Sequence, residues 1–439
     1  METWQIALYL LPTLALMYLY VRRMHNVESR HRTTLSESVE AGLGEPVSLH
    51  PVVDPVRCMG SGACVAACPE QALGIIDGKA QLIDASACIG HGACAAACPF
   101  EAIHLVFGTE ARGVDIPQVS PAFETNVPGI FIAGELGGMG LIHKATEQGR
   151  RAIETISRRT GDGRRRGAEL DLVIVGAGPA GLSASLAAKQ KGLKYVTIEQ
   201  ESALGGSILH YPRQKLAMTV PMDLPIVGKV VWREISKESL LEFWSDVVRR
   251  TGLNIRFGER METLKPETAG FRVITPRGAY SAGSVLLSIG RRGTPRKLGV
   301  PGETQEKVVY RLMDPQQYRR RRVLVVGGGD SAIEAALAVC AEEGAEVVLS
   351  YRGKAFSRVK PKNRKRFDEA LAAARLRTLM ESTVTAIEHE RVQIAHRGTP
   401  LMLPNDAVIV CAGGELPTPM LKDIGVMVAT HYGTAAVAR

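Results

Sequence analysis

The clearest hydrophobic pattern in the chain is an apolar run, Leu172–Val175, that ends in glycines and is followed by an Ala/Leu-rich stretch and a second apolar run ending at Glu199. Such runs predict strands of a parallel sheet buried on both faces, and the stretch between them predicts a helix. The same pattern returns over residues 321–352. Two strand–loop–helix–strand units predict an α/β fold with two Rossmann-like, dinucleotide-binding domains.

The glycine spacing of the first unit favours binding of a pyrophosphate. Gly176 permits the tight turn, Gly178 lets backbone N–H groups approach the phosphates, and Gly181 lets the helix pack on the strand. The N-terminus of the helix adds unpaired N–H groups and a positive dipole end. Glu199, eighteen residues after the third glycine, is placed to accept hydrogen bonds from a ribose.

The second unit favours NADPH over NADH. Its glycine loop, Gly327–Gly329, leads into Asp330 and Ser331, and its second strand ends in Ser-Tyr-Arg352 where an acid would suit NADH. A carboxylate there would repel a 2′-phosphate, whereas a guanidinium binds it. The basic run at 360–366 adds positive charge nearby. The alternative is that Arg352 is only a surface charge.

Six of the eight cysteines fall between positions 58 and 98, in a duplication with a period of thirty. CMGSGACVAACPEQA (58–72) repeats as CIGHGACAAACPFEA (88–102), and the residues between predict a hairpin turning at Asp77-Gly78. The apolar content of this small module is too low for a core of its own. We therefore expect an inorganic group to hold it together.

The N-terminus carries an uncharged, mostly apolar segment from Trp4 to Val21, followed by Arg22 and Arg23. This pattern predicts a single uncleaved helix (residues 1–25) in the inner, cytoplasmic membrane, with the remaining domains facing the cytoplasm. An amphipathic or buried helix is the alternative. Residues 26–49 are polar and predict a linker.

Length and charge limit the remaining choices. A chain of 439 residues holds two or three domains. The net charge of +9 fits attraction of phosphate-bearing cofactors or of an acidic partner, or simply a solvated basic surface. No interleaving of aromatic and basic residues points to nucleic acid, so we expect none as a partner.

Two dinucleotide units of these kinds imply FAD together with NADPH. Over residues 108–439 the chain resembles the thioredoxin-reductase-like flavoproteins, in particular the bacillithiol-disulfide-reductase-like branch. The matching stretches are 176–181, Glu199, 205–213, 288–303, GGGDSA and SYRG. The resemblance implies FAD contacts at Gly134, Glu135, Gly176, Gly178, Gly181, Glu199, Gly206 and Gly290, and NADPH contacts at Gly327, Gly329, Asp330, Ser331, Arg352 and Arg358.

The order of segments departs from that family. In those enzymes a strand ending Gly-x-Phe-x-Ala-Gly-Asp, with its helix, stands at the C-terminus, whereas here Gly129–Glu135 precedes the first dinucleotide unit. The resemblance thus implies a circularly permuted FAD domain, built from residues 108–160, 168–305 and 410–439, with the NADPH domain at 306–409. We expect Arg439 to lie near residues 108–115 and Glu135, in place of Asp, to contact FAD. A plain linker domain is the alternative.

The flavoprotein part also lacks the C-x-x-C of a dithiol reductase. Its two cysteines, Cys340 and Cys411, stand alone in apolar surroundings and are expected to be buried. This weakens the prediction of disulfide reduction by the chain itself.

The cysteine module, residues 50–107, resembles bacterial ferredoxins with two clusters, a small α+β fold whose run is C-x2-C-x2-C-x3-C-P. In both runs here the second cysteine is replaced. Position by position, the resemblance implies one set of Cys58, Ser61, Cys64 and Cys98, and another of Cys88, His91, Cys94 and Cys68. With three thiolates in each set, either a 4Fe–4S or a 3Fe–4S cluster is compatible with the ligands, and zinc is the alternative metal.

These parts predict an NADPH-linked oxidoreductase that passes electrons through FAD and two iron–sulfur clusters to a cytochrome- or ferredoxin-like protein, or in reverse. No acid–base residue is predicted as catalytic. A disulfide or persulfide reductase using external thiols is one alternative, and a membrane-tethered redox or gas sensor is another. A homodimer is also considered.

Overall fold

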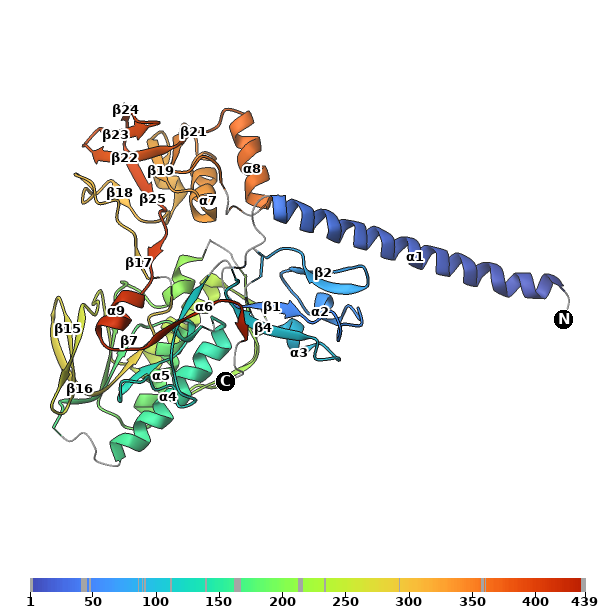
Figure 1. The fold of residues 1–439 in the computed structure, drawn as a ribbon. Coiled ribbons are helices and arrows are strands. Elements are labelled where there is room, and N and C mark those ends of the chain that lie inside the picture. The colour runs from blue at the N-terminus through green and yellow to red at the C-terminus, as the bar shows by residue number, and fades with distance from the viewer. Residues whose placement is uncertain are drawn as a thin grey trace. The chain divides into compact units, whose positions relative to one another are not determined.

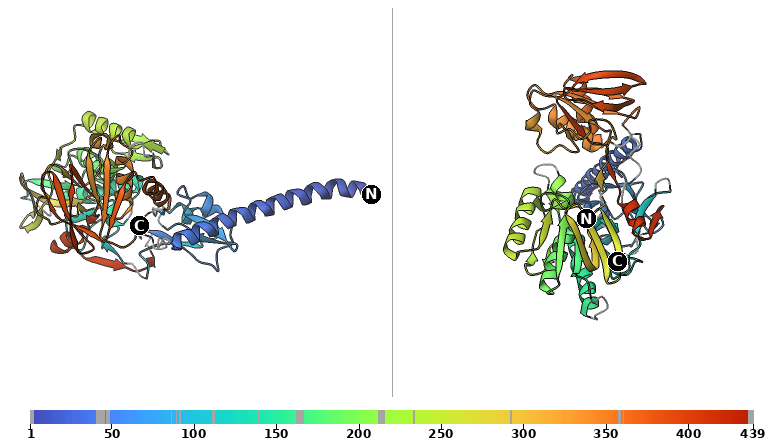
Figure 2. Two further views of the ribbon diagram at one scale, coloured as in Figure 1. Left: turned by 90° about the horizontal axis from the view of Figure 1, so that it is seen from above. Right: turned by 90° about the vertical axis from the view of Figure 1, so that its left-hand side faces the viewer.

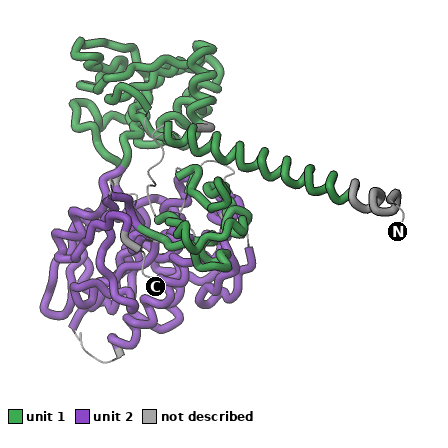
Figure 3. The backbone as a smooth tube through the Cα atoms, turned by 45° about the vertical axis from the view of Figure 1, so that its right-hand side comes forward, with its two compact units in different colours: residues 1–106, 295–413 green, residues 107–294, 414–439 purple. Residues whose placement is uncertain are grey.

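The computed structural model describes residues 3–40, 46, 49–85, 87–88, 90, 92–110, 113–138, 140–161, 167–211, 216–232, 234–291, 293–356, 359 and 361–435. The chain forms two compact units (Figure 3), one of residues 1–106 with 295–413 and the other of residues 107–294 with 414–439. Each unit is thus built from segments that are distant in the sequence.

The first unit begins with one long helix, α1 (Thr3–Glu40), which Figure 2 shows as continuous. The helix runs past residue 25 and through most of the segment for which we expected a linker, so that expectation is wrong as far as Glu40. Within the part of the chain that the structure describes, no helix is both long enough and apolar enough to cross a membrane. The expected membrane-spanning anchor is therefore not supported.

The helix continues because its polar end packs against the cysteine module. The His31 ring nitrogen Nδ1 lies 3.1 Å from both the N and the O of Ile75. Glu28 accepts a hydrogen bond from the backbone N–H of Asp77 at 2.8 Å, and Arg32 pairs with the Asp77 carboxylate. These residues, spaced three and four apart, share one helix face.

The cysteine module repeats one short unit, as the duplication predicts. Each half has a loop, a one-turn helix and a strand (Figure 1). Both helices begin after a glycine in the left-handed region, Gly62 (φ 74°) and Gly92 (φ 78°). The predicted hairpin at Asp77-Gly78 is confirmed by the antiparallel pairing of β2 with β3, and β1 pairs antiparallel with β4. The elements are β1 (His50–Val53), α2 (Ala63–Ala66), β2 (Leu73–Ile76), β3 (Lys79–Leu82), α3 (Ala93–Ala96) and β4 (Ile103–Phe107).

The second dinucleotide unit forms a parallel sheet of order β18-β25-β19-β20-β21. Strand β25 is buried along its length and β19 at its three central residues, as their continuous apolar sequences predict. An antiparallel sheet, β22-β23-β24, adjoins its core. The elements are β18 (Val308–Val309), β19 (Arg322–Val326), α7 (Asp330–Val339), β20 (Glu346–Tyr351), α8 (Pro361–Ala372), β21 (Arg377–Met380), β22 (Ser382–Ile387), β23 (Arg391–His396), β24 (Thr399–Pro404) and β25 (Ala407–Val410).

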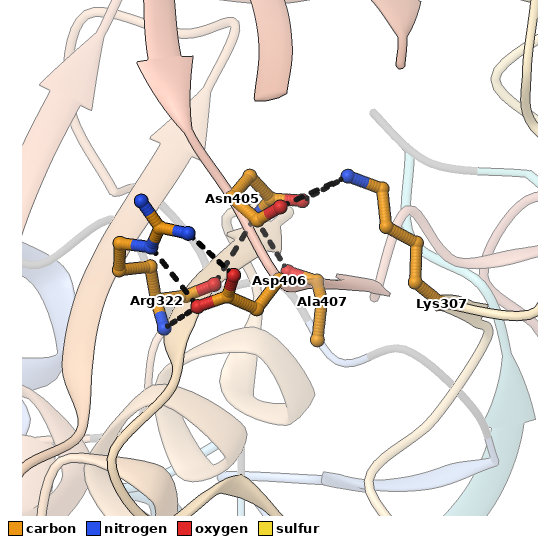
Figure 4. Close-up of polar contacts among 5 residues, drawn as sticks. All are labelled: Lys307, Arg322, Asn405, Asp406 and Ala407. Atoms are coloured by element: carbon orange, nitrogen blue, oxygen red, sulfur yellow. Dashed lines mark hydrogen bonds and ion pairs between the residues drawn. The ribbon is translucent and has the colours of Figure 1, made fainter. Parts of the chain in front are cut away.

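A polar cluster ties together the N-terminal ends of β19 and β25 (Figure 4). The Asp406 carboxylate accepts from the backbone N–H of Arg322 at 2.8 Å and from its guanidinium at 2.6 Å. Asn405 donates to the carbonyl oxygen of Ala407 at 2.7 Å, and Lys307 donates to the Asn405 side chain at 3.0 Å. The cluster lies at the opposite end of the strands from the glycine loop, so we assign it to stability.

The second compact unit, residues 107–294 with 414–439, is built on a seven-stranded sheet. Its strand order is β13-β8-β7-β16-β15-β14, with β6 paired to β16. Strand β7 and its neighbours are parallel and buried, with Leu172, Val173 and Ile174 fully inaccessible. Helices α4 and α5 cover one face of the sheet with small side chains. The main elements are β6 (Ile130–Ile132), α4 (Ile142–Gly161), β7 (Leu170–Val175), α5 (Pro179–Gln190), β8 (Tyr195–Glu199), α6 (Lys237–Thr251), β13 (Ile255–Phe257), β14 (Thr263–Glu267), β15 (Gly270–Thr275) and β16 (Gly278–Leu287).

The segment upstream of the first dinucleotide unit is part of this sheet. Val285 of β16 pairs with Ile130 of β6, so the strand that precedes Gly134 lies beside the central strands. Near the C-terminus, β27 (Val428–His431) pairs antiparallel with β5 (Val114–Pro117). The backbone N–H of Gly433 also donates to Phe107 at 3.0 Å. Arg439 itself lies outside the described residues.

Shorter elements complete the chain. They are the 3-10 turns η1 (Glu135–Gly137), η2 (Gly206–His210) and η3 (Pro315–Tyr318), helix α9 (Thr418–Asp423), and strands β9 (Leu216–Met218), β10 (Met222–Leu224), β11 (Gly228–Val230), β12 (Glu234–Ser236), β17 (Thr294–Pro295), β26 (Gly414–Glu415) and β28 (Thr434–Ala435).

Candidate cofactor-binding sites

The first glycine loop has the close packing that its sequence predicts. Gly176 has a φ of 102°, and a Cβ at that position would lie 2.6 Å from the carbonyl oxygen of Ser288. A Cβ at Gly181 would overlap the carbonyl oxygen of Gly176. Gly178 instead faces open space except for Gly206, and it starts α5 without any side-chain cap. The helix therefore presents free N–H groups where a pyrophosphate would bind.

Glu199 lies at the end of β8, directly beside this loop. One carboxylate oxygen accepts from the backbone N–H of Ala177 at 2.6 Å and the other from Glu201 at 2.9 Å. Burial raises the pKa of Glu199, while these two hydrogen bonds oppose that rise. A carboxylate has about four acceptor sites, so Glu199 can accept further hydrogen bonds, which fits the predicted contact with a ribose.

Three further predicted FAD residues come together from separate segments. Glu135 begins the turn after Gly134, and its carboxylate accepts from the Ser207 hydroxyl at 3.3 Å. A Cβ at Gly290 would lie 3.6 Å from the same carboxylate. Gly134 has a φ of 84°, which favours glycine, and its N–H donates to Gln148 at 2.8 Å. Segments near residues 135, 207 and 290 thus converge at one place.

Two residues at this place were not predicted from the sequence. Ser207 directly follows Gly206 in the motif of residues 205–213, so the motif itself could have indicated this hydroxyl as a candidate. Arg291 follows Gly290, and its guanidinium donates to the carbonyl oxygen of Asp115 at 3.0 Å. Burial lowers the pKa of Arg291, and the carboxylates of Glu135 and Asp115 act to raise it. Only the fold could show that this cation faces those carboxylates.

The second glycine loop carries a similar uncapped helix start. Helix α7 begins after Gly329 without a side-chain cap, and a Cβ added at Gly329 would meet nothing within 4 Å. Gly327 has a φ of 149° and packs on the carbonyl oxygen of Cys411. The ring of Tyr351, which the sequence did not single out, lies against Gly328 and Gly353 and leaves no room for a Cβ at either.

The side chains predicted around NADPH surround this loop. Arg352 is exposed just after β20, and Ser331 is exposed in the first turn of α7. Asp330 accepts a hydrogen bond from Asn363 of α8 at 2.8 Å, which joins the two helices. Arg358 lies outside the described residues. The open loop and the exposed guanidinium fit a phosphate-bearing dinucleotide.

Thiols that the resemblance groups together lie near one another, and their division into two ligand sets stays a prediction. Burial raises the pKa of Cys64, and the nearby thiols of Cys58 and Cys98 raise it further. Burial likewise raises the pKa of Cys94, to about 11, with further contributions from Cys88, Cys68 and Cys64. Cys68, Cys88 and Cys94 line one small pocket. No three His, Cys, Asp or Glu side chains among the described residues lie close enough to hold a single metal ion.

Backbone N–H groups point at the sulfur atoms. Ala80 donates to Cys58 Sγ at 3.3 Å, and Ala102 donates to Cys98 Sγ at 3.4 Å. Such N–H···S bonds are a recurrent feature of iron–sulfur sites and tune the potential of the cluster. The donor set and its hydrogen bonds therefore fit two iron–sulfur clusters.

The two substituted ligand positions stay predictions. Ser61 is exposed, and its hydroxyl accepts a long bond, 3.5 Å, from Ala63 at the start of α2. His91 lies outside the described residues. In the flavoprotein part, Cys340 is buried in the core as expected, and its thiol donates to Leu337 at 3.3 Å; Cys411 is half-buried.

A family model described as pyridine nucleotide-disulphide oxidoreductase matches residues 173–437. The match covers more than half of the chain, and the protein therefore belongs to this family, as an NAD(P)H-dependent flavin oxidoreductase. A model described as a 4Fe-4S dicluster domain matches residues 50–99. Together they establish FAD, NADPH and iron–sulfur clusters as the cofactors.

Among curated relatives, bacilliredoxin reductase Bdr of Bacillus subtilis is 28% identical over 268 residues, which cover 60% of this chain and 82% of the relative. A ferredoxin–NADP reductase of Thermus thermophilus is 32% identical over 255 residues, covering 55% and 72%. Another, from Ignicoccus hospitalis, is 29% identical over 266 residues, covering 58% and 81%.

Solved structures show a weaker likeness. Bacillithiol disulfide reductase Bdr from Staphylococcus aureus has 25% identity and a TM-score of 0.47, covering 60% of this chain and 84% of that one. The enzyme from Bacillus cereus has 25% identity and a TM-score of 0.48, covering 59% and 82%.

Proposed function

We propose that this protein carries electrons from NADPH through FAD and two iron–sulfur clusters to a one-electron acceptor protein, or in the reverse direction. The observation that carries the proposal is the presence, in one chain, of two thiol sets suited to clusters and two uncapped glycine-loop helices. No C-x-x-C follows Cys98 in this sequence, so a dithiol partner for the flavin is missing from it.

The residues divide the work by position. The start of α5 would bind the flavin pyrophosphate, Glu199 would hold the ribose, and Glu135 with Ser207 would hold the chain that leads to the flavin ring. The start of α7 would bind the NADPH pyrophosphate, and Arg352 its 2′-phosphate. When bound, FAD converts a two-electron hydride donor into a source of single electrons, which clusters require.

Within this proposal the FAD domain is circularly permuted. The pairing of β6 with β16 supports it, since the strand that leads to Glu135 precedes the first dinucleotide unit in the sequence but lies in its sheet. The match to the pyridine nucleotide-disulphide oxidoreductase model begins at residue 173, so β6 and Glu135 lie upstream of it. The pairing of β27 with β5 supports it as well, because the C-terminal segment meets the start of the permuted segment.

The names of the relatives support two acceptor classes. Several are called ferredoxin–NADP reductases, which fits a ferredoxin-like partner, and one is called a bacilliredoxin reductase. The name bacilliredoxin reductase favours the alternative, reduction of an external disulfide. The cysteine module favours the ferredoxin-like partner, because its thiols suit iron–sulfur clusters.

The test is anaerobic reduction of the purified protein by NADPH, followed by EPR and by assay with cytochrome b5 as acceptor. We expect NADPH to reduce both clusters, and Cys64→Ser and Cys94→Ser to abolish cytochrome reduction while NADPH still bleaches the flavin. Undiminished cytochrome reduction by both variants would contradict the proposal. Zinc in place of iron would contradict it too.

A further inference from the structure

An exposed apolar surface lies beside the first cysteine set. Its members are Val56, Met59 and Phe100, which we call the apolar patch, and they are 86%, 66% and 46% exposed. Val56 and Met59 flank Cys58, and Phe100 follows Cys98 by two residues. Both cysteines belong to the set of Cys58, Cys64 and Cys98. Large apolar side chains this exposed, gathered at a redox site, mark a contact surface.

Hydrogen bonds hold the two parts of the patch side by side. Asp54 shapes the first turn, since its carboxylate accepts from the backbone N–H of Val56 at 2.8 Å. The N–H of Asp54 donates to the carbonyl oxygen of Ala102 at 2.8 Å. The Arg57 guanidinium reaches the carbonyl oxygen of Glu101 at 3.4 Å. The turn that carries Val56 and Met59 therefore adjoins the turn that carries Phe100.

The internal repeat differs at the position of Phe100, while Ser86 and Ile89, which correspond to Val56 and Met59, lie outside the described residues. Phe100 stands directly after Cys98-Pro99, and the same position of the other half, after Cys68-Pro69, is Glu70. Glu70 lines the same small pocket as Cys68, Cys88 and Cys94. A partner that covered Glu70 would have to desolvate a carboxylate, whereas covering Phe100 releases water from apolar surface.

Cations adjoin the patch. Arg57 is exposed between Val56 and Cys58, and the Lys79 ammonium donates to the carbonyl oxygen of Cys58 at 2.6 Å. Two carboxylates lie there as well, the exposed Glu101 and the half-buried Asp54. The net charge of +9 for the chain favours an acidic partner, whose approach it would speed.

We propose that the apolar patch is the docking surface for an acidic one-electron redox protein, and that the cluster of Cys58, Cys64 and Cys98 is the one from which electrons leave. This inference rests on the proposed function. For each NADPH oxidised to NADP+ and H+, two electrons leave singly and reduce two ferric haems to ferrous, so two acceptor molecules dock in turn. A patch of three side chains fits the small, short-lived interfaces of electron-transfer complexes.

The test uses the full chain carrying Phe100→Glu, which introduces the residue that the other repeat carries at the same position. Met59→Gln is a second variant, and Met402→Glu, at an exposed position of β24, is the control for an added charge. Iron and flavin contents confirm that each variant is loaded. Three rates are compared, namely cluster reduction by NADPH in single turnover, ferricyanide reduction and cytochrome b5 reduction.

We expect Phe100→Glu to lower kcat/KM for cytochrome b5 about tenfold, the loss typical of a central contact residue, through a higher KM. Cluster and ferricyanide reduction should match the wild type, as should every rate of Met402→Glu. Unchanged cytochrome b5 reduction by both patch variants overturns the inference. Slower cluster reduction by NADPH also overturns it, because the patch would then serve electron entry. If NADPH does not reduce the clusters of the wild-type protein, the proposed function itself is contradicted.

Discussion

Single glycines decide how closely the backbone segments of the flavin loop approach one another. Gly176 and Gly181 are packed against backbone oxygens, whereas Gly178 faces open space and Gly206. The sequence motif predicts all three roles, although only the contact of Gly181 with Gly176 lies within one strand–loop–helix unit; Gly176 packs on Ser288 and Gly178 on Gly206. The meeting of Glu135, Ser207 and Gly290 depends on segments that are distant in the sequence, so spacing alone could not predict it.

We expect Gly181→Ala to lose flavin and stability together. The new Cβ would overlap the carbonyl oxygen of Gly176, which is backbone and has no room to yield. A cost of about 2 kcal/mol, within the range for overpacking, is expected in urea unfolding, with reduced flavin absorbance. Gly178→Ala is the contrast, since its Cβ would meet only Gly206 at 3.7 Å. That variant should fold normally, and a folding defect equal to that of Gly181→Ala would contradict the packing argument.

The ion pair of Asp406 with Arg322 predicts a pH-dependent contribution to stability. The Arg322 guanidinium lowers the pKa of Asp406 from its ordinary value of 3.8 to about 2, although burial acts to raise it. Because the folded pKa is the lower one, the stabilisation is present above about pH 4 and is lost as the pH falls toward 2. The pair is partly solvent-exposed, so its contribution is on the order of 1 kcal/mol.

Asp406→Asn tests this dependence by urea unfolding between pH 7 and pH 2.5. The variant should be less stable than the wild type at pH 7, and the difference should shrink below about pH 4. Asp223→Asn, at an exposed position with no ion pair among the described contacts, serves as the control. A difference that stays constant over this range would contradict the assignment.

At the scale of elements, α1 shows how tertiary contacts extend a helix beyond its hydrophobic segment. The continuous apolar segment ends at Val21, and composition alone predicts a linker beyond residue 25. The helix nevertheless continues to Glu40, because Glu28, His31 and Arg32 bind the hairpin of β2 and β3. Helices gain most of their stability in proteins from such contacts. Gly74 is part of this fit, since a Cβ there would collide with the His31 ring.

We expect His31→Ala to loosen α1 from the cysteine module. Loss of its contacts with Ile75 should speed tryptic cleavage at the arginines of residues 30–32, measured under native conditions. His25→Ala is the matched control, since His25 is exposed on the same helix. Equal cleavage of the two variants would show that the His31 contact does not hold the helix.

At the scale of the whole molecule, the order of segments differs from their order in space. Strand β6 precedes the first dinucleotide unit but pairs with β16 at its far end, and β27 returns to pair with β5. The motif at Gly129–Glu135 predicts this arrangement only through its resemblance to a known family. The pairings themselves are long-range and form only when the sheets assemble.

A reordered chain tests the permutation. It begins at Gly167, runs to Arg439 and continues through a short linker into residues 108–160; the pairing of β27 with β5 makes the linker short. We expect this chain to bind FAD and to reduce ferricyanide with NADPH. A chain that ends at Arg439 without residues 108–160 should bind no FAD, because it lacks β6 and α4. Failure of the reordered chain to bind FAD would contradict the permutation.

The sequence by itself determined the parts that local spacing defines. These are the two glycine loops, the buried strands around them, the hairpin at Asp77-Gly78 and the duplicated cysteine runs. Only the tertiary structure decided which distant residues share a site, how far α1 extends, and that the turn of Val56 and Met59 lies beside the turn of Phe100. The physical reason is that hydrophobic periodicity and turn chemistry act over a few residues, whereas these features depend on contacts between segments far apart in the chain.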